Sequence, residues 1–272
     1  MNVFLAAPVA ALATVLLIFG IARLRGRYDT IDSVWGAGFA VIAVVSALVG
    51  TGSALAWTVA ALTAVWGVRL SAHLHRRNSG KPEDRRYQDM ASRYGDRAWP
   101  LMFLRVYLVQ GVVLWFVSLP VQAAQAVDVR GLGPLGWAGI LVWVGGFVFE
   151  TVGDAQLSRF RADPANSGEV LDTGLWRYTR HPNYFGDACV WWGLYLLACE
   201  TGLGAVTVLS PLLMTWLLAR GTGKPLLERG LRERRPGYAA YVERTSGFLP
   251  SRRVGESLGR CGLRRRGGAG LG

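Results

Sequence analysis

Seven long apolar runs restrict the folds open to this chain. They lie at Val3–Ala22, Ile31–Gly50, Ala54–Leu70, Leu101–Val121, Gly136–Gly153, Tyr184–Glu200 and Leu203–Ala219. A helix of about 20 apolar residues crosses the roughly 30 Å hydrocarbon core of a bilayer, where no water is available to satisfy an open backbone. The alternating pattern of a membrane β-barrel is absent. The sequence therefore predicts an all-α polytopic membrane bundle of about seven transmembrane helices, forming one domain over residues 1–250.

The basic residues follow the odd-numbered runs. Apart from Arg69, Arg105 and Arg130, all 30 Lys and Arg residues lie in segments after the first, third, fifth and seventh runs. Because loops rich in Lys and Arg stay on the cytoplasmic side, this pattern predicts an outside N-terminus and a cytoplasmic C-terminus. The Arg-, Ala- and Gly-rich composition and the short loops suggest a bacterial cytoplasmic membrane. An endoplasmic reticulum membrane is the alternative.

The formal net charge of +12 does not indicate a nucleic-acid partner in a chain of this kind. Charge that sets membrane topology is attracted to anionic headgroups, so the expected partner is the lipid bilayer. Residues 251–272 are rich in Arg and Gly and are predicted to form a basic, disordered tail. No metal site is predicted, because His73 and His75 are two residues apart and do not share a helix face.

Two acidic residues lie at the end of the fifth run. Glu150 and Asp154 are four residues apart and therefore share one helix face. Charged groups inside a membrane are costly and usually face a cavity or a partner. The pair is either part of an interfacial ion-pair ladder with Arg159 and Arg161, or a polar wall around a cofactor.

The segment Leu171–Asp187 carries the densest chemistry. Pro182 is placed to begin the sixth helix, whose free N–H groups and positive dipole end favour an anion. Basic and aromatic residues come just before it: Arg177, Tyr178, Arg180 and His181. Asn183 and Asp187 follow one turn apart inside the apolar run. The segment predicts a site for a phosphate-bearing ligand, although a helix start that binds only lipid headgroups would share its basic residues.

The stretch Leu175–Asp187, with the sequence LWRYTRHPNYFGD, resembles the C-terminal signature of the steroid 5-alpha-reductase superfamily and is most similar to its bacterial branch. The resemblance extends to Tyr28–Gly36, Phe149–Leu157, Phe160–Asn166 and Pro236–Tyr241. It thus covers nearly the whole chain, and the combination is more specific than Arg-His-Pro alone.

The resemblance implies a seven-helix bundle that binds NADPH from the cytoplasmic side. The implied reaction is reduction of a carbon–carbon double bond conjugated to a carbonyl in a lipid-like, steroid-like or isoprenoid-like substrate. The cofactor-binding part spans about residues 136–250. Its expected cofactor-binding residues are Glu150, Asp154, Arg161, Asn166, Arg177, Tyr178, Arg180, His181, Asn183 and Asp187.

Asp32 falls where the family places the carboxylic acid that hydrogen-bonds the substrate carbonyl. A buried acid can donate to an oxygen on which charge develops, so Asp32 is the predicted catalytic residue; the alternative is an Asp at a helix start. Tyr28 and Gln110 are further candidates for lining the pocket. Steroid-reducing members pair their acid with a tyrosine from the third span, where this chain has Trp66. This departure weakens the expectation of a steroid 3-ketone substrate.

Two other functions fit parts of the sequence. Isoprenylcysteine carboxyl methyltransferases share a segment similar to Arg180–Gly186 and bind S-adenosylmethionine. A non-enzymatic lipid-binding membrane protein is the third possibility. The acidic face of Glu150 and Asp154, together with the full-length resemblance, favours the reductase.

Overall fold

The computed structural model describes residues 2–129, 131–221, 228, 230–231 and 235–251. Its elements are helical: α1 Val3–Arg25, η1 Tyr28–Val34, α2 Trp35–Val49, α3 Ala54–Asn78, α4 Arg85–Tyr94, η2 Gly95–Arg97, α5 Ala98–Met102, η3 Phe103–Tyr107, α6 Leu108–Val117, α7 Leu119–Ala126, α8 Pro134–Ala162, η4 Pro164–Asn166, η5 Gly174–Arg177, α9 Pro182–Ala198, α10 Gly202–Ala205, η6 Val206–Val208, α11 Leu209–Ala219 and α13 Tyr238–Arg244. The predicted tail, apart from Ser251, lies outside the described residues.

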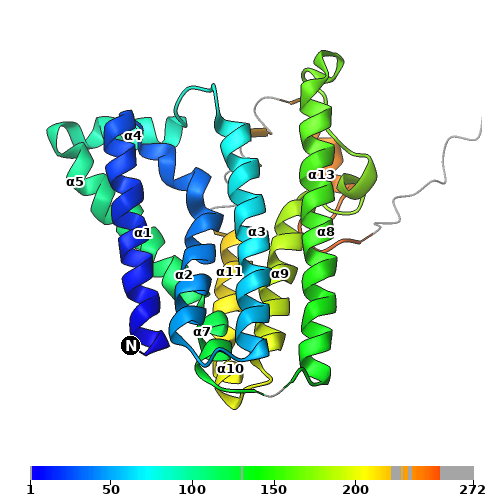
Figure 1. The fold of residues 1–272 in the computed structure, drawn as a ribbon. Coiled ribbons are helices and arrows are strands. Elements are labelled where there is room, and N and C mark those ends of the chain that lie inside the picture. Colours follow the sequence, from blue (N-terminus) through cyan, green and yellow to red (C-terminus); the bar gives the residue numbers. More distant parts are fainter. Residues whose placement is uncertain (1, 130, 222–227, 229, 232–234, 252–272) are drawn as a thin grey trace, which may run out of the picture.

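The long helices lie side by side and form a bundle (Figure 1). Six segments of the described chain are long and apolar enough to cross a membrane: Val3–Arg25, Tyr28–Val49, Ala54–Asn78, Arg85–Val117, Pro134–Ala162 and Gly202–Ala219. These correspond to six of the seven predicted spans, and they make the chain a multi-pass membrane protein.

The remaining predicted span is α9, and it differs from the others in length and surroundings. It has 17 residues, the lower end of the length that crosses a bilayer. Trp191, Leu194 and Leu197 on it are fully buried. Pro182 occupies its first turn, as predicted. The helix is therefore a central element of the bundle.

Glycine pairs bring α9 against α8. A side chain on Gly139 would meet the backbone of Gly193, and one on Gly186 would meet the backbone of Gly146 and Glu150. Small residues that let two backbones approach are typical of membrane helix contacts. The backbone of α8 thus approaches α9 closely at Gly186, which sets Asp187 beside Glu150.

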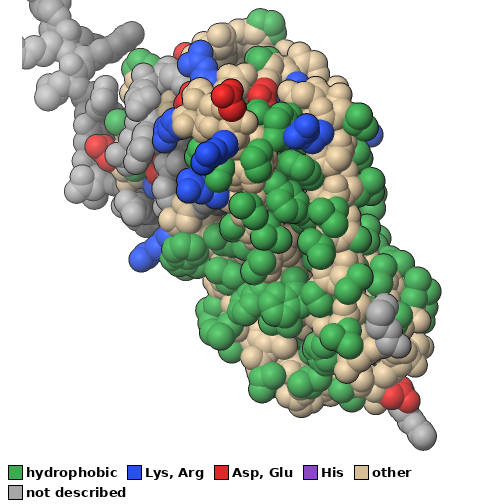
Figure 2. Space-filling view, turned by 90° about the vertical axis from the view of Figure 1, so that its left-hand side faces the viewer, with side chains coloured by type: hydrophobic (Ala, Val, Ile, Leu, Met, Phe, Trp, Pro, Cys, Tyr) green, Lys and Arg blue, Asp and Glu red, His purple; other side chains and the backbone are tan. Residues whose placement is uncertain are grey.

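One end of the bundle carries many of the described basic residues. α1, α3 and α8 all run towards it, and each has Arg residues in its last turn. Figure 2 shows the blue side chains of Lys and Arg at this end, above a surface dominated by hydrophobic side chains. We call it the basic end. An apolar surface beside a charged one matches a bilayer core next to its headgroups.

Candidate active site

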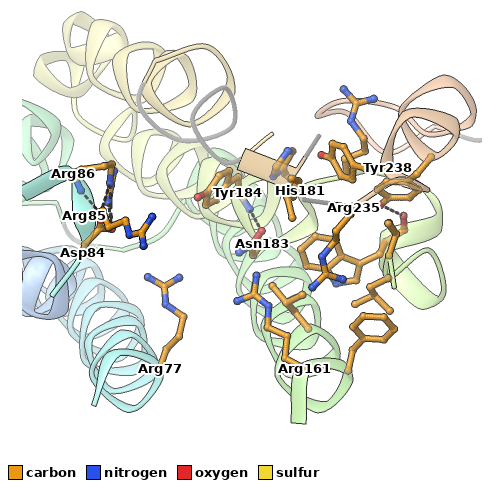
Figure 3. A pocket seen from close by; sticks show the side chains of 18 residues that line it. Arg77, Asp84, Arg85, Arg86, Arg161, His181, Asn183, Tyr184, Arg235 and Tyr238 are labelled. Atoms are coloured by element: carbon orange, nitrogen blue, oxygen red, sulfur yellow. Dashed lines mark hydrogen bonds and ion pairs between the residues drawn. The ribbon is translucent and has the colours of Figure 1, made fainter. Parts of the chain in front are cut away.

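Two adjoining cavities lie towards the basic end. The first has a volume of about 490 Å³ and is strongly basic (Figure 3). Its polar and charged lining consists of Arg77, Asp84, Arg85, Arg86, Arg161, Arg180, His181, Asn183, Tyr184, Arg235, Tyr238 and Tyr241. We call it the basic cavity. Its charge suits a ligand that carries phosphate groups.

The second cavity, of about 430 Å³, is mostly apolar. Its apolar lining consists of Trp35, Leu70, Leu74, Val109, Val113, Met214, Leu217 and Leu218, and its polar lining includes Asp32, His73, Tyr87, Gln110, Glu150, Asp154 and Asp187. We call it the apolar cavity. Arg77, Arg86, Asn183 and Tyr184 line both cavities, so the two share a wall.

An arginine that the sequence analysis did not assign holds the acidic pair of α8. Arg69 on α3 donates to Glu150 Oε1 at 2.6 Å and to Asp154 Oδ2 at 2.6 Å. Trp66, one turn earlier, donates its indole N–H to Glu150 Oε2 at 2.9 Å. Trp66, which belongs to α3, therefore stabilises the acidic pair of α8. The predicted sharing of one face by Glu150 and Asp154 is confirmed, and their basic partner comes from another helix.

Asn183 and Asp187 extend this cluster from α9 in different ways. Asn183 donates its side-chain N–H to Asp154 Oδ1 at 3.0 Å. Asp187 is 7% exposed, and its Oδ1 has no hydrogen-bond partner within the described part of the chain. A buried carboxylate oxygen without a donor is costly unless a ligand supplies one. The geometry thus leaves this acceptor unpaired on a residue that lines the apolar cavity.

Asp32 has a tyrosine partner, which comes from α4 and not from the third span. The Tyr87 hydroxyl donates to Asp32 Oδ1 at 2.6 Å, and Arg86 Nη2 lies 3.6 Å from Asp32 Oδ2. Both Tyr87 and Arg86 belong to α4. Gln110, on α6, interacts with the Tyr87 hydroxyl. Asp32 is therefore hydrogen-bonded to a tyrosine 55 positions away in the sequence, while the third span still has Trp66 and no tyrosine.

Arg180 and His181 are held by the C-terminal part of the chain. Glu228 Oε1 accepts from Arg180 Nε at 2.9 Å and lies 3.0 Å from His181 Nε2. Arg180 also donates to the carbonyl groups of Val242 and Thr245. Burial alone would raise the pKa of Glu228, but hydrogen bonds and charge from His181 and Arg180 outweigh it and lower the pKa to about 2.

Besides Arg85 on α4, three arginines in the basic cavity form no ion pair with an acidic residue of the described chain. They are Arg77 at the end of α3, Arg161 at the end of α8, and Arg235. Figure 3 shows the three guanidinium groups on different sides of the same space. Arg161, which the sequence analysis proposed, is thus joined by two that it missed. Their charge is available to an anionic ligand.

Four predicted positions lie outside the lining of both cavities. Arg177 and Tyr178 are exposed, Asn166 donates to the Phe160 carbonyl at 3.0 Å, and the Tyr28 ring packs on Trp99 with centroids 4.2 Å apart. Motif position alone does not show which way a side chain points. The other predicted residues, including Gln110, line a cavity.

The bundle and its two adjoining cavities define the chain as a multi-pass membrane protein with two cavities towards one end. The chain belongs to the family described as protein of unknown function DUF1295, a steroid 5-alpha-reductase-like family whose model matches residues 18–245. It is 24% identical over 215 residues to the uncharacterized protein C594.04c of Schizosaccharomyces pombe, covering 70% of this chain and 61% of that protein. The chain therefore spans less than two thirds of this relative's length. No solved structure matches it.

Proposed function

We propose that this protein is an NADPH-dependent reductase of a carbon–carbon double bond conjugated to a carbonyl in a lipid-like substrate. The basic end faces the cytoplasm, where the nucleotide is available. The observation that carries the proposal is the shared wall: a basic cavity and an apolar cavity meet at Asn183 and Tyr184. A reductase of this type needs a charged nucleotide and an apolar substrate in contact, and this arrangement provides both sites.

The residues present fit NADPH. Arg77, Arg161 and Arg235 offer positive charge for its phosphate groups. The open acceptor Asp187 Oδ1 suits a ligand with an N–H donor, such as a carboxamide. Bound NADPH would supply the hydride and leave as NADP⁺. Methylation from S-adenosylmethionine needs no cluster of phosphate-binding arginines, so the same residues favour the reductase.

The protein side chains that can take part in the reaction are Asp32 and Tyr87. Reduction adds a hydride to the β-carbon and a proton to the α-carbon, so the double bond becomes single while charge develops on the carbonyl oxygen during the reaction. The Tyr87 hydroxyl and a protonated Asp32 are groups in the apolar cavity that can donate to that oxygen. The apolar walls exclude water and strengthen this interaction.

A binding measurement on detergent-purified protein tests the cofactor assignment. We expect NADPH to bind and S-adenosylmethionine not to bind. Asp187→Ala and Arg161→Ala should each weaken NADPH binding by roughly tenfold or more, since hydrogen bonds to charged groups contribute about 1.5–3 kcal/mol. Arg159→Ala is the matched control, because Arg159 is on the same helix but exposed and outside both cavities. Unchanged affinity in Asp187→Ala and Arg161→Ala would remove the assignment.

Replacing Tyr87 tests the catalytic pair separately. Tyr87→Phe should lower kcat by about 10²-fold, the scale of one acid–base group, while NADPH affinity stays unchanged. Tyr94→Phe is the control on the same helix, because Tyr94 lines neither cavity. Equal kcat values for the two variants would exclude Tyr87 from the reaction.

A further inference from the structure

The loop that joins α3 to α4 is bound to η1 by reciprocal hydrogen bonds. Glu83 in the loop accepts with its carboxylate from the main-chain N–H groups of Tyr28 and Asp29. In return, the Asp29 carboxylate accepts from the main-chain N–H of Asp84 at 3.1 Å. Each carboxylate binds the backbone of the other segment, so these bonds fix how the two segments lie against each other. We call Asp29 and Glu83 the clasp.

Arg27 holds the Asp29 side of the clasp. Its guanidinium donates to both carboxylate oxygens of Asp29, at 3.1 and 2.8 Å, and to the Lys81 carbonyl at 2.8 Å. Asp29 is only 7% exposed, and charge-assisted hydrogen bonds away from water are strong. Arg27, Asp29 and Glu83 are outside the lining of the basic and apolar cavities. The clasp is therefore placed to act on the protein and not on a ligand.

The clasp sets the register in which η1 and the start of α4 lie side by side. Three contacts join residues that are 55 positions apart: Tyr28 with Glu83, Asp29 with Asp84, and Asp32 with Tyr87. In the 3-10 helix η1, side chains three residues apart lie above one another, and residues three apart are also neighbours on an α-helix. The bond between Asp32 and Tyr87 is thus the next turn of the register that the clasp sets. A slip of one residue would move the Tyr87 hydroxyl away from Asp32.

Asp84 extends this register into α4. It is the N-cap of the helix, and its carboxylate accepts from the main-chain N–H of Arg86 and from the Arg86 guanidinium, each at 2.9 Å. The Tyr87 N–H donates to the Asp84 carbonyl at 3.0 Å. An N-cap fixes the first turn of its helix. The position of Asp84, which Asp29 holds, therefore decides where Tyr87 begins.

We propose that Asp29 and Glu83 are positioning residues for the reaction: they hold η1 and α4 in register, so that the Tyr87 hydroxyl stays within hydrogen-bond distance of Asp32. This proposal rests on the proposed function, in which Asp32 and Tyr87 donate to the substrate carbonyl. A misplacement of about 1 Å can lower a rate by about 10²-fold. Loss of the clasp therefore slows the chemical step more than it weakens NADPH binding.

Kinetics of Glu83 variants test this role, with detergent-purified protein, NADPH and 3-nonen-2-one as the probe. Glu83→Ala should lower kcat by about tenfold or more and change the Kd for NADPH by less than about threefold. Glu83→Gln should recover most of the lost rate, because its amide oxygen can accept from the same two main-chain N–H groups. Asp89→Ala is the matched control, since Asp89 is exposed on α4 and outside both cavities.

A double-variant cycle separates positioning from a general loss of structure. Tyr87→Phe removes the hydroxyl that the clasp holds, so adding Glu83→Ala to it should lower kcat by less than about twofold further. An equal loss of kcat from Glu83→Ala in the wild-type and Tyr87→Phe backgrounds would mean that Glu83 acts independently of Tyr87. That result would overturn the proposal.

A spectroscopic measurement reports the same contact without turnover. 3-Fluorotyrosine in place of Tyr87 reports the hydrogen bond of its hydroxyl through the fluorine chemical shift, and Asp32→Asn marks the shift obtained when the carboxylate is lost. Glu83→Ala and Asp29→Ala should each move the resonance towards the Asp32→Asn position. Asp89→Ala should leave it at the wild-type position.

The outcomes distinguish this proposal from the proposed function. Failure of the wild type to bind NADPH removes the proposed function, while a displaced resonance in Glu83→Ala would still show that the clasp holds Tyr87 against Asp32. NADPH binding and enone reduction by the wild type, with an unmoved resonance in both Glu83→Ala and Asp29→Ala, would overturn the positioning role and leave the proposed function intact.

Discussion

Two buried charge clusters flank the site, and they have opposite compositions. In the first, Arg69 stands between Glu150 and Asp154 inside the helical bundle. In the second, Glu228 stands between Arg180 and His181, where the C-terminal part of the chain meets the start of α9. We call them the Arg69 cluster and the Glu228 cluster.

The difference lies in what each cluster leaves unpaired. The Arg69 cluster has more carboxylates than bases, and with Asp187 beside it one buried acceptor has no donor in the described chain. In the Glu228 cluster, Arg180 is surrounded by one carboxylate and two carbonyl groups. A satisfied cluster stabilises structure, whereas an unsatisfied one is suited to a ligand. The sequence motif contains residues of both kinds.

Removing the base of the Arg69 cluster should have the largest effect. Arg69→Met leaves Glu150 and Asp154 buried without their cation, and breaking a buried ion pair costs about 3–5 kcal/mol. Denaturant unfolding in detergent should show this loss, whereas Arg76→Met, at an exposed position on the same helix, should change stability by less than about 0.5 kcal/mol. Similar stability for the two variants would mean that the carboxylates do not depend on Arg69.

Replacing the acid of the Glu228 cluster should have a smaller and more local effect. Glu228→Gln keeps the shape but removes the charge that Arg180 and His181 share, for an expected loss of about 1–3 kcal/mol. Hydrogen exchange should increase at amides that join the C-terminal part to the α9 start, including Arg180 N to Ser246 O and Ser251 N to Tyr178 O. Amides within α8 should be unaffected, and Glu169→Gln, at an exposed position, is the control. Faster exchange throughout α8 and α9 would show that the cluster supports the whole bundle.

The sequence predicted what depends on local spacing. The apolar runs predicted the helices, and the four-residue spacing of Glu150 and Asp154 predicted that they share one face. Pro182 predicted where α9 begins. Each of these follows from helix geometry within one segment. The family resemblance added Asp32, which the structure places in the lining of one cavity together with Asn183 and Asp187.

The partners of these residues could not be predicted, because they depend on how helices pack. Arg69 and Glu150 are 81 positions apart, and Arg180 and Glu228 are 48 apart. Which residues meet is decided by contacts such as the glycine pairs between α8 and α9. Tyr87 illustrates the same limit: the third span has Trp66 and no tyrosine, while α4 brings a tyrosine hydroxyl to Asp32 from outside that span.

Lowering the pH should weaken the Glu228 cluster, and this is the smallest of the expected effects near neutral pH. Its pH range is specific to Glu228. The folded pKa of Glu228, about 2, lies below its ordinary value of 4.5. A depressed carboxylate pKa contributes stability above pH 4.5 that is lost as the pH falls from 4.5 through about 2. Exchange at Arg180 and Ser251, relative to amides of α9, should therefore rise as the pH falls below 4.5. In Glu228→Gln this ratio should already be high and should not change over that range. A wild-type ratio that stays flat down to pH 2 would mean that the charge of Glu228 does not hold the C-terminal part in place.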